Sequence, residues 1–168
     1  TRRSSDLSFL DKGGKIVCWG RSSELFEGVL SLEDGKEKEE FQLPYSDISS
    51  SLRKEGLYVP GSFIRIRLKQ NHPLTLGMPA ETGVFSRGRP VFRTGIPGFD
   101  VDRRVIASYP GEEILMSGYA KGLDALENQA AMIWVKKGEG EMVLFGFNPQ
   151  FRASTQSTFK LLFNSLLL

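Results

Sequence analysis

The chain has 168 residues, enough for one domain with a real hydrophobic core, and its 40% hydrophobic and 25% charged residues are ordinary for a globular protein. A formal net charge of +2 is too balanced to indicate a nucleic-acid partner through the electrostatic field alone. No apolar run approaches the ~20 residues of a membrane span, and one cysteine excludes an internal disulfide without fixing the compartment.

The first forty residues predict part of an α/β unit, in which the chain begins with a helix and not with a strand. Residues 4–10 resemble the last turns of a helix, and Lys15–Trp19 is a short apolar strand. A capped helix is expected from Glu24 to about Leu30, and the charged residues 33–40 are expected to be a solvated loop. Because a doubly wound domain normally begins with a strand, we expect that one or two strands precede this chain and that the domain is N-terminally truncated.

The middle of the chain predicts a short helix at residues 47–55, followed by several short strands. Phe63–Leu68 alternates strictly between apolar and polar residues, so it should be a strand near a sheet edge with one buried face. The proline- and glycine-containing residues 71–79 predict a fixed, irregular loop. Further short strands are expected at residues 83–86, 90–92, 105–109 and 114–119.

The C-terminal third carries the strongest pattern. Ala130–Val135 and Met142–Phe147 are continuously apolar, which favours central strands covered on both faces. The short turn between them makes an antiparallel hairpin, because a parallel crossover needs a dozen residues or more. A final helix should begin near Thr155, with a core-facing stripe at the i, i+3, i+4 and i+7 positions Phe159, Leu162, Phe163 and Leu166.

These elements together predict one α/β domain over residues 1–168. The expected architecture is a three-layer, flavodoxin- or amidotransferase-like mixed sheet with a C-terminal antiparallel hairpin and a terminal helix.

The polar residues after the last predicted strand are the first candidate site. Asn148, Gln150 and Arg152 stand where a ligand can reach the carboxyl end of a strand, and the guanidinium of Arg152 could hold a carboxylate. The alternative is a structural joint, in which Asn148 bonds its own turn and Ser154 or Thr155 caps the helix. Polar residues at strand-to-helix joints commonly do turn and capping work, which favours the joint.

The sequence offers few catalytic groups. It contains no G-x-S-x-G nucleophile elbow and no phosphate-binding glycine loop, and one histidine cannot form a multi-histidine zinc site. His72 could be a ligand or a general base, although such a histidine more often caps a turn. Cys18 could pair with it, although its apolar surroundings favour a core thiol. We therefore expect no catalytic residue and no metal ligand in this chain.

A cluster of arginines lies in the region that follows the predicted 83–86 strand. It could be a nucleic-acid or anion surface, with aromatic residues nearby. The balanced net charge favours a solvated loop face that is balanced by Glu81, Asp100 and Asp102. The arginines are Arg87, Arg89, Arg93, Arg103 and Arg104.

The order of several short motifs resembles the C-terminal, class I glutamine amidotransferase-like domain of bacterial zinc carboxypeptidases of the carboxypeptidase A-like family. The last thirty residues match best. The matching residues are Gly13-Gly14, Pro60-Gly61-Ser62, His72-Pro73-Leu74, Gly77-Met78-Pro79, Gly138, Gly140, Phe145-Gly146-Phe147, Pro149-Gln150, Arg152 and Thr158-Phe159-Lys160-Leu161-Leu162-Phe163-Asn164.

The resemblance implies an accessory domain without its own catalysis. The H-x-x-E pair, the later histidine and the glutamate base of the peptidase cannot be placed here, so zinc and its ligands would lie in a peptidase domain upstream in the same polypeptide. The Cys-His-Glu set of the amidotransferases is also absent. The resemblance further implies an exported or periplasmic protein.

Three hypotheses follow from the sequence. The chain is a non-catalytic module that packs on a metallopeptidase domain or helps to place its peptide substrate. Alternatively it is an oligomerisation or ligand-binding module, like the amidotransferase-type domain that assembles some β-galactosidases. The third hypothesis is a degenerate hydrolase that uses Cys18 and His72.

Overall fold

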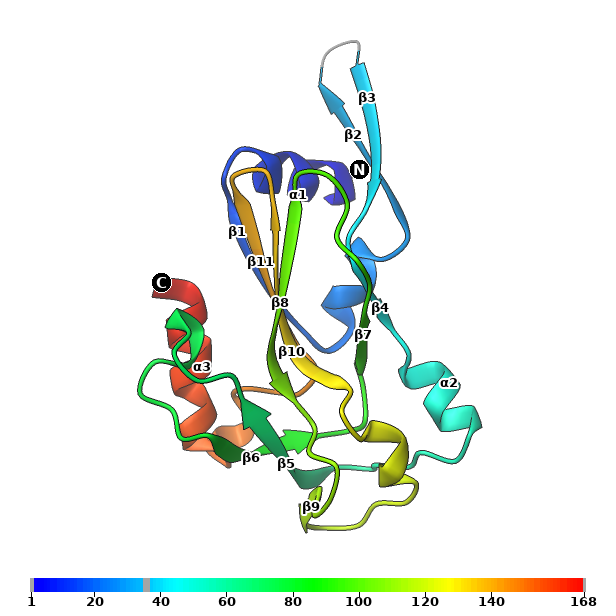
Figure 1. The fold of residues 1–168 in the computed structure, drawn as a ribbon, viewed down its shortest axis with the longest axis vertical. Helices are drawn as coiled ribbons and strands as arrows, with labels where there is room; N and C mark the ends of the chain where they lie inside the picture. Colours follow the sequence, from blue (N-terminus) through cyan, green and yellow to red (C-terminus); the bar gives the residue numbers. More distant parts are fainter. Residues whose placement is uncertain (1, 35–36, 168) are drawn as a thin grey trace.

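The computed structural model describes residues 2–34 and 37–167. Within them, nine strands form one mixed sheet (Figure 1). The first two strands of its path run parallel, and the other strand pairs are antiparallel. In spatial order the path is β1 (Lys15–Trp19), β11 (Gly140–Phe145), β10 (Ala130–Lys137), β8 (Val101–Ser108), β5 (Ser62–Leu68) and β6 (Glu81–Ser86).

Three short strands branch from this path, and the helices are few. β4 (Tyr45–Asp47) pairs with β7 (Phe92–Thr94), β7 pairs with β10, and β9 (Leu115–Ser117) pairs with β5. The α-helices are α1 (Arg2–Asp11), α2 (Ser49–Lys54) and α3 (Gln156–Leu167). Four 3₁₀ turns complete the described chain: η1 (Gly20–Phe26), η2 (Pro73–Thr75), η3 (Leu123–Leu126) and η4 (Phe151–Ala153).

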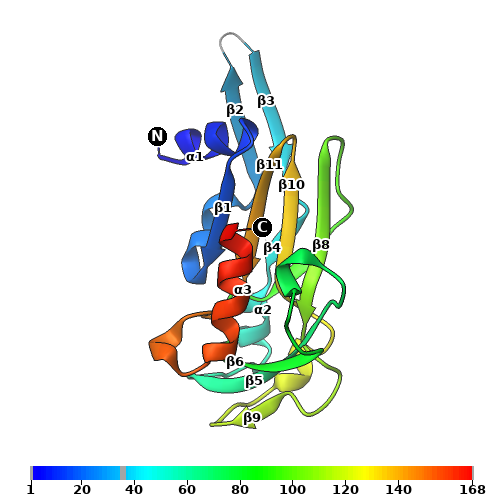
Figure 2. The same cartoon turned by 90° about the vertical axis from the view of Figure 1, so that its left-hand side faces the viewer.

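The alternation of β11 divides the core between the two faces of the sheet. Met142 and Leu144 pack in a cluster with Leu10 of α1, whereas Val143 and Phe145 pack in a second cluster with Leu161 of α3. Figure 2 shows α3 lying along one face of the sheet. Side chains that are buried on both faces explain why residues 142–145 of this strand are all apolar.

The structure confirms the mixed sheet, the β10–β11 hairpin and the C-terminal helix. The strand predicted at Phe63–Leu68 is also present, with alternating burial and a place next to the terminal strand β6. The molecule is nevertheless dominated by its sheet, and two segments before β4 differ from the prediction.

The predicted Glu24–Leu30 helix and the 33–40 loop are both wrong where the structure describes them. The chain forms η1 and then a separate hairpin of β2 (Val29–Asp34) and β3 (Glu37–Gln42), which projects from the body (Figure 1). Residues 35–36 lie outside the described residues. Alternate side chains of β2, Leu30 and Leu32, are buried. The alternating burial of a strand therefore decides the structure of this segment, and its charged residues do not.

The core-facing stripe predicted for α3 is rotated in the structure. The buried positions are Thr158, Leu161 and Ser165, whereas Phe163 is 56% exposed. Small hydroxyl residues can face the core here because Thr158 Oγ1 donates to the Pro149 carbonyl at 2.6 Å and Ser165 Oγ donates to the Leu161 carbonyl at 2.7 Å. Satisfied hydroxyls remove the penalty of burying a polar group.

A buried lysine ties the β2–β3 hairpin to the main sheet. The Lys137 ammonium donates to Glu39 Oε1 at 2.9 Å and to Asp100 Oδ2 at 3.2 Å, and it lies 5.1 Å from the centre of the Phe41 ring. Burial by itself would lower the pKa of Lys137, but the hydrogen bonds to the two carboxylates outweigh it and raise the pKa.

We expect Lys137→Met, which keeps the stem and removes the charge, to lower the free energy of unfolding by about 1 kcal/mol near neutral pH. A raised folded-state pKa stabilises the fold below the unfolded value of about 10.4 and loses that contribution as the pH rises through the folded value. The difference between variant and wild type, measured by urea unfolding, should therefore shrink in strong alkali. Lys136→Met, on the neighbouring and less buried position, is the control. An equal loss in both variants would contradict the role of Lys137.

Candidate functional site

The carboxyl ends of the parallel pair β1 and β11 open into a pocket of about 160 Å³. Trp19 and Phe145 are the last paired residues of the two strands, so the segments that follow them leave the sheet side by side. Gly20 makes the first turn with a positive φ of 60°, which glycine adopts at little cost. The pocket is lined by Gly20, Arg21, Glu24, Asp47, Arg87, Arg89, Pro90, Phe147 and Asn148.

Of the residues predicted after β11, the structure brings Asn148 to this pocket. Its backbone N–H donates to the Phe85 carbonyl at 3.2 Å, which fixes the chain as it leaves the sheet. Gln150 and Arg152 are exposed and are not among the lining residues. Pro149 belongs to the joint, because its carbonyl accepts from Thr158 of α3.

Arg152 lies in an unusual backbone conformation beside an aromatic stack. Its φ is 47°, and that of Ala153 is 55°. Phe85 and Phe151 are stacked with ring centres 3.7 Å apart, and the guanidinium of Arg152 lies 5.5 Å from the Phe151 centre. Arg87 lies 6.0 Å from the same ring. The stack therefore carries one arginine that lines the pocket and one that does not.

His72 is in a different place. Its Nδ1 accepts from the Leu74 N–H at 3.3 Å and so caps the start of η2. Burial, with Lys69 and Arg104 nearby, lowers the pKa of His72. The histidine lines a separate, more open pocket of about 440 Å³ in the loop beside α3. The structure thus separates His72 from Asn148.

Cys18 lies on the α1 side of the sheet. It is 3% exposed and belongs to the cluster that contains Leu7 and Leu10 of α1. Burial is the main cause that raises the pKa of the thiol. A thiol with a raised pKa is a poor nucleophile at neutral pH.

Asp47, which comes from β4, lines the pocket and accepts several hydrogen bonds there. Its Oδ1 accepts from the backbone N–H of Ser49 at 2.9 Å and of Val91 at 3.0 Å, and its Oδ2 accepts from the Ser49 hydroxyl at 3.0 Å. The Asp47 N–H donates to Glu27, whose pKa is raised mainly by burial. Asp47 therefore joins three separate segments of the chain at this point.

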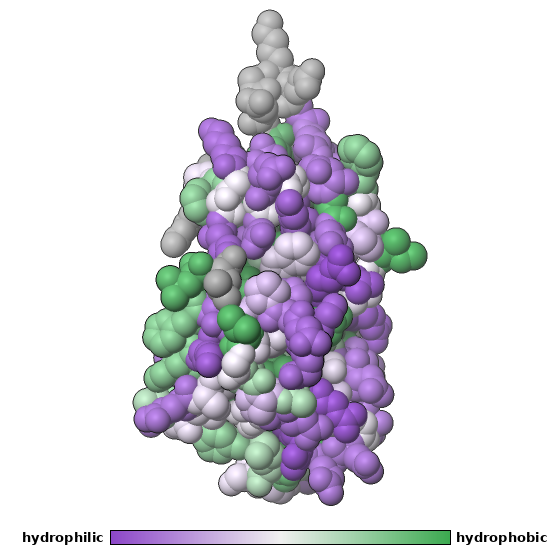
Figure 3. Space-filling view, turned by 60° about the vertical axis from the view of Figure 1, so that its left-hand side comes forward, coloured by the Kyte–Doolittle hydropathy of each residue, from purple (hydrophilic) through white to green (hydrophobic). Residues whose placement is uncertain are grey.

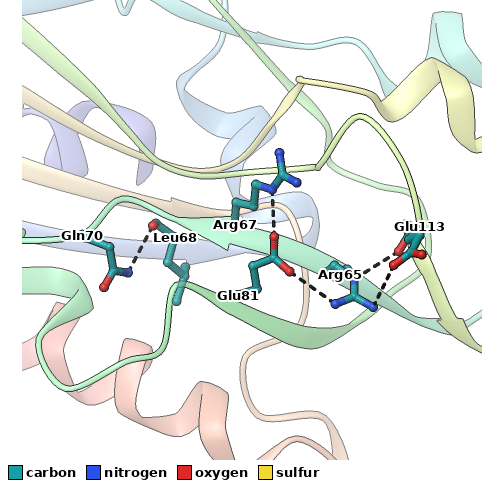
Figure 4. Close-up of polar contacts among 6 residues, drawn as sticks. All are labelled: Arg65, Arg67, Leu68, Gln70, Glu81 and Glu113. Atoms are coloured by element: carbon teal, nitrogen blue, oxygen red, sulfur yellow. Dashed lines mark hydrogen bonds and ion pairs between the residues drawn. The ribbon is translucent and has the colours of Figure 1, made fainter.

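Two of the three acids that were predicted to balance the arginine cluster, Glu81 and Asp100, pair with residues outside it. Glu81 binds Arg67 at 2.8 Å and Arg65 at 3.3 Å on the exposed side of β5 and β6 (Figure 4). The hydrogen bond from Arg67 is the main cause that holds the pKa of Glu81 below its usual value. Arg65 also lies 3.9 Å from Glu113 (Figure 4).

Asp100 pairs with Lys137, and Asp102 pairs with Arg104 at 3.1 Å. Asp102 therefore balances Arg104 as predicted. Arg87 and Arg89 are exposed, in keeping with a solvated face, and neither has an ion pair within residues 2–34 and 37–167.

Two further properties concern metals and membranes. The described residues hold no group of three or more His, Cys, Asp or Glu side chains placed to bind a metal ion. Among the helices of the described chain, none combines the length and the apolar character needed to cross a bilayer.

Comparison with known proteins gives a fold but no family. No protein-family model matches the chain, and no curated protein is similar enough to count as a relative. The chain shares its fold with part of a β-galactosidase. That enzyme, from Bacillus circulans sp. alkalophilus, matches over 97% of this chain with a TM-score of 0.50 and 14% identity, and the match spans 20% of the enzyme.

Weaker likenesses extend to two other bacterial proteins. A ThuA-like protein from Bacteroides uniformis matches 98% of this chain and 61% of its own at a TM-score of 0.47 and 12% identity. A cytoplasmic protein from Salmonella typhimurium matches 98% of this chain and 58% of its own at a TM-score of 0.48 and 12% identity.

Proposed function

We propose that this chain is a non-catalytic accessory domain of a larger hydrolase, and that the hydrolase is a zinc carboxypeptidase of the carboxypeptidase A-like family. The domain would be a sheet-rich member of the three-layer, amidotransferase-like architecture. The observation that carries the proposal is the make-up of the pocket at the carboxyl ends of β1 and β11. A doubly wound enzyme binds its ligand there. The polar side chains that line this pocket are arginines, carboxylates and an amide, and the thiol and imidazole of the described chain lie elsewhere.

The reactive side chains of the domain are placed for structure. The thiol of Cys18 is buried on the α1 side, and the imidazole of His72 caps a turn beside α3. These two residues do not fit a zinc site, because they lie in different parts of the fold and zinc needs three or four ligands around one point. The zinc of the proposed parent enzyme would be held by its peptidase domain.

The finer assignment to a carboxypeptidase rests on the motifs of the C-terminal third. Phe145-Gly146-Phe147 and Pro149-Gln150 form the end of β11 and its exit. Gly146 lies in a confined place, since a Cβ on it would be 2.8 Å from the carbonyl oxygens of Ala131 and Pro90. This part of the motif thus has a structural reason in this fold, whatever the parent enzyme is.

The test compares the whole polypeptide with the isolated chain. The reading frame upstream of this sequence should encode an H-x-x-E pair and a later histidine, and the whole polypeptide should bind zinc and release C-terminal amino acids from peptides. The isolated chain should do neither. Stoichiometric zinc together with peptide hydrolysis by the isolated chain would contradict the proposal.

Cys18 offers a direct check on the rival hydrolase hypothesis. We expect the native thiol to react slowly with a thiol reagent at neutral pH, because burial raises its pKa and blocks access, and to react rapidly after unfolding in urea. The measurement is the rate of absorbance change with a chromogenic disulfide. Fast labelling of the native protein would favour a nucleophilic Cys18.

An oligomerisation module remains the second candidate function, because the outer side of α3 is apolar. Phe163 is 56% exposed, Leu166 57% and Leu167 80%. Figure 3 shows apolar side chains gathered on the side of the molecule that carries α3. Light scattering separates the two candidates, since a stable trimer of the pure chain favours oligomerisation and a monomer favours packing on an upstream peptidase domain.

A further inference from the structure

The pocket at the ends of β1 and β11 has an excess of positive charge that the fold does not neutralise. Three arginines and two carboxylates line it, so the formal charge of the lining is 3 − 2 = +1. Arg21 is paired with Glu24 at 3.3 Å, and Asp47 already accepts three hydrogen bonds. The other two arginines of the lining, Arg87 and Arg89, have no ion pair within the part of the chain that the structure describes.

The segment that carries these arginines is held in place on both sides. The Ser86 hydroxyl accepts from the Gly88 N–H at 3.0 Å, and the Val91 N–H is bound by Asp47 at 3.0 Å. Arg87 also lies against the ring of Phe151, which is stacked on Phe85. A segment that is fixed before binding loses little conformational entropy when a ligand arrives.

We propose that this pocket binds a carboxylate group through Arg87 and Arg89, with the side chain of Asn148 as an additional polar contact. Guanidinium groups form paired hydrogen bonds with carboxylates and phosphates. The carboxylates of Glu24 and Asp47 in the same lining repel a dianion more than a monoanion, which favours a carboxylate over phosphate. A volume of about 160 Å³ is below the range of sites for whole drug-sized ligands, so it suits a single charged group.

This proposal does not depend on the identity of the parent hydrolase. The carboxylate could belong to a free small molecule or to the C-terminus of a peptide, and both present the same group. The two sources differ in what is attached to it, so probes of different size distinguish them.

The experiment is an NMR titration of the ¹⁵N-labelled chain at constant pH and ionic strength. The probes are sodium acetate for a free carboxylate, N-acetylglycine for a peptide C-terminus and sodium phosphate. We expect acetate or N-acetylglycine to shift the amide signals of Gly20, Gly88 and Asn148 in a saturable way. Tighter binding of N-acetylglycine would assign the source to a chain end, and equal binding would assign it to small carboxylates.

The variants Arg87→Gln and Arg89→Gln should each raise the Kd for the carboxylate about tenfold. Both side chains are exposed, so neither change should disturb folding. Arg93→Gln is the matched control, because it removes the same charge from an exposed position of β7 outside this pocket, and its Kd should stay within about twofold of the wild type. The proposal is overturned if no carboxylate saturates the shifts, if phosphate binds more tightly, or if all three variants weaken binding equally.

Discussion

Gly140→Ala is expected to lower the free energy of unfolding by about 3 kcal/mol, the upper end of what overpacking a core usually costs. Gly140 begins β11, and the C-terminal end of α1 crosses directly above it. A Cβ at this position would overlap the carbonyl oxygen of Leu10 and lie 2.7 Å from its carbonyl carbon. Because that neighbour is backbone, the clash cannot be relieved by a change of rotamer, and α1 must move.

Gly111→Ala is the control for this experiment. Its Cβ would meet nothing within 4 Å, and its φ lies outside the left-handed region, so we expect a change of less than about 0.5 kcal/mol. Urea unfolding followed by circular dichroism measures both variants. If Gly140→Ala were as stable as Gly111→Ala, the close packing of α1 on β11 would be wrong.

Phe145→Ala should cost about 3–5 kcal/mol, because it removes a large side chain from the centre of the core and leaves a cavity. Phe145 is 0% exposed and packs edge to face with Phe147 at 5.4 Å between ring centres. It is also the last residue of β11, immediately before the segment that lines the pocket. The loss should therefore weaken both the fold and the pocket.

The matched control is Phe99→Ala, since Phe99 is fully exposed at 100%. The same chemical change there should alter the free energy of unfolding by less than about 0.5 kcal/mol. Thermal and urea unfolding of the two variants give the comparison. A similar loss in both would mean that Phe145 does not lie in the core.

The sequence predicts those elements whose residues repeat with a clear period. β5 shows the alternation of a strand with one exposed face. Residues 130–135 of β10 and 142–145 of β11 are all apolar because both faces of the sheet are covered there. The β2–β3 hairpin escapes this reasoning, since its strands are charged and it is formed by pairing between two segments, with Leu30 opposite Phe41. α3 is found from its period, but its buried face is missed because Thr158 and Ser165 are polar.

Only part of the candidate site can be predicted from the sequence, because its residues come from several segments of the chain. The rule that ligands approach the ends of strands leads to Asn148, which does line the pocket. Arg21, Asp47 and Arg89 come from three other segments that the sheet brings together, and no local pattern connects them. The signal that the sequence does offer is the arginine cluster, but only the structure shows that Glu81 and Asp100 pair with other residues, Arg67 and Lys137.

β1 is the strand at one end of the main sheet path. Within the described residues, β1 pairs with β11 on one side and with no strand on the other. An unpaired strand edge can act as a template for a strand from a second molecule. At high concentration the separate chain can therefore aggregate through this border, and light scattering on dilute protein distinguishes that aggregation from a discrete trimer.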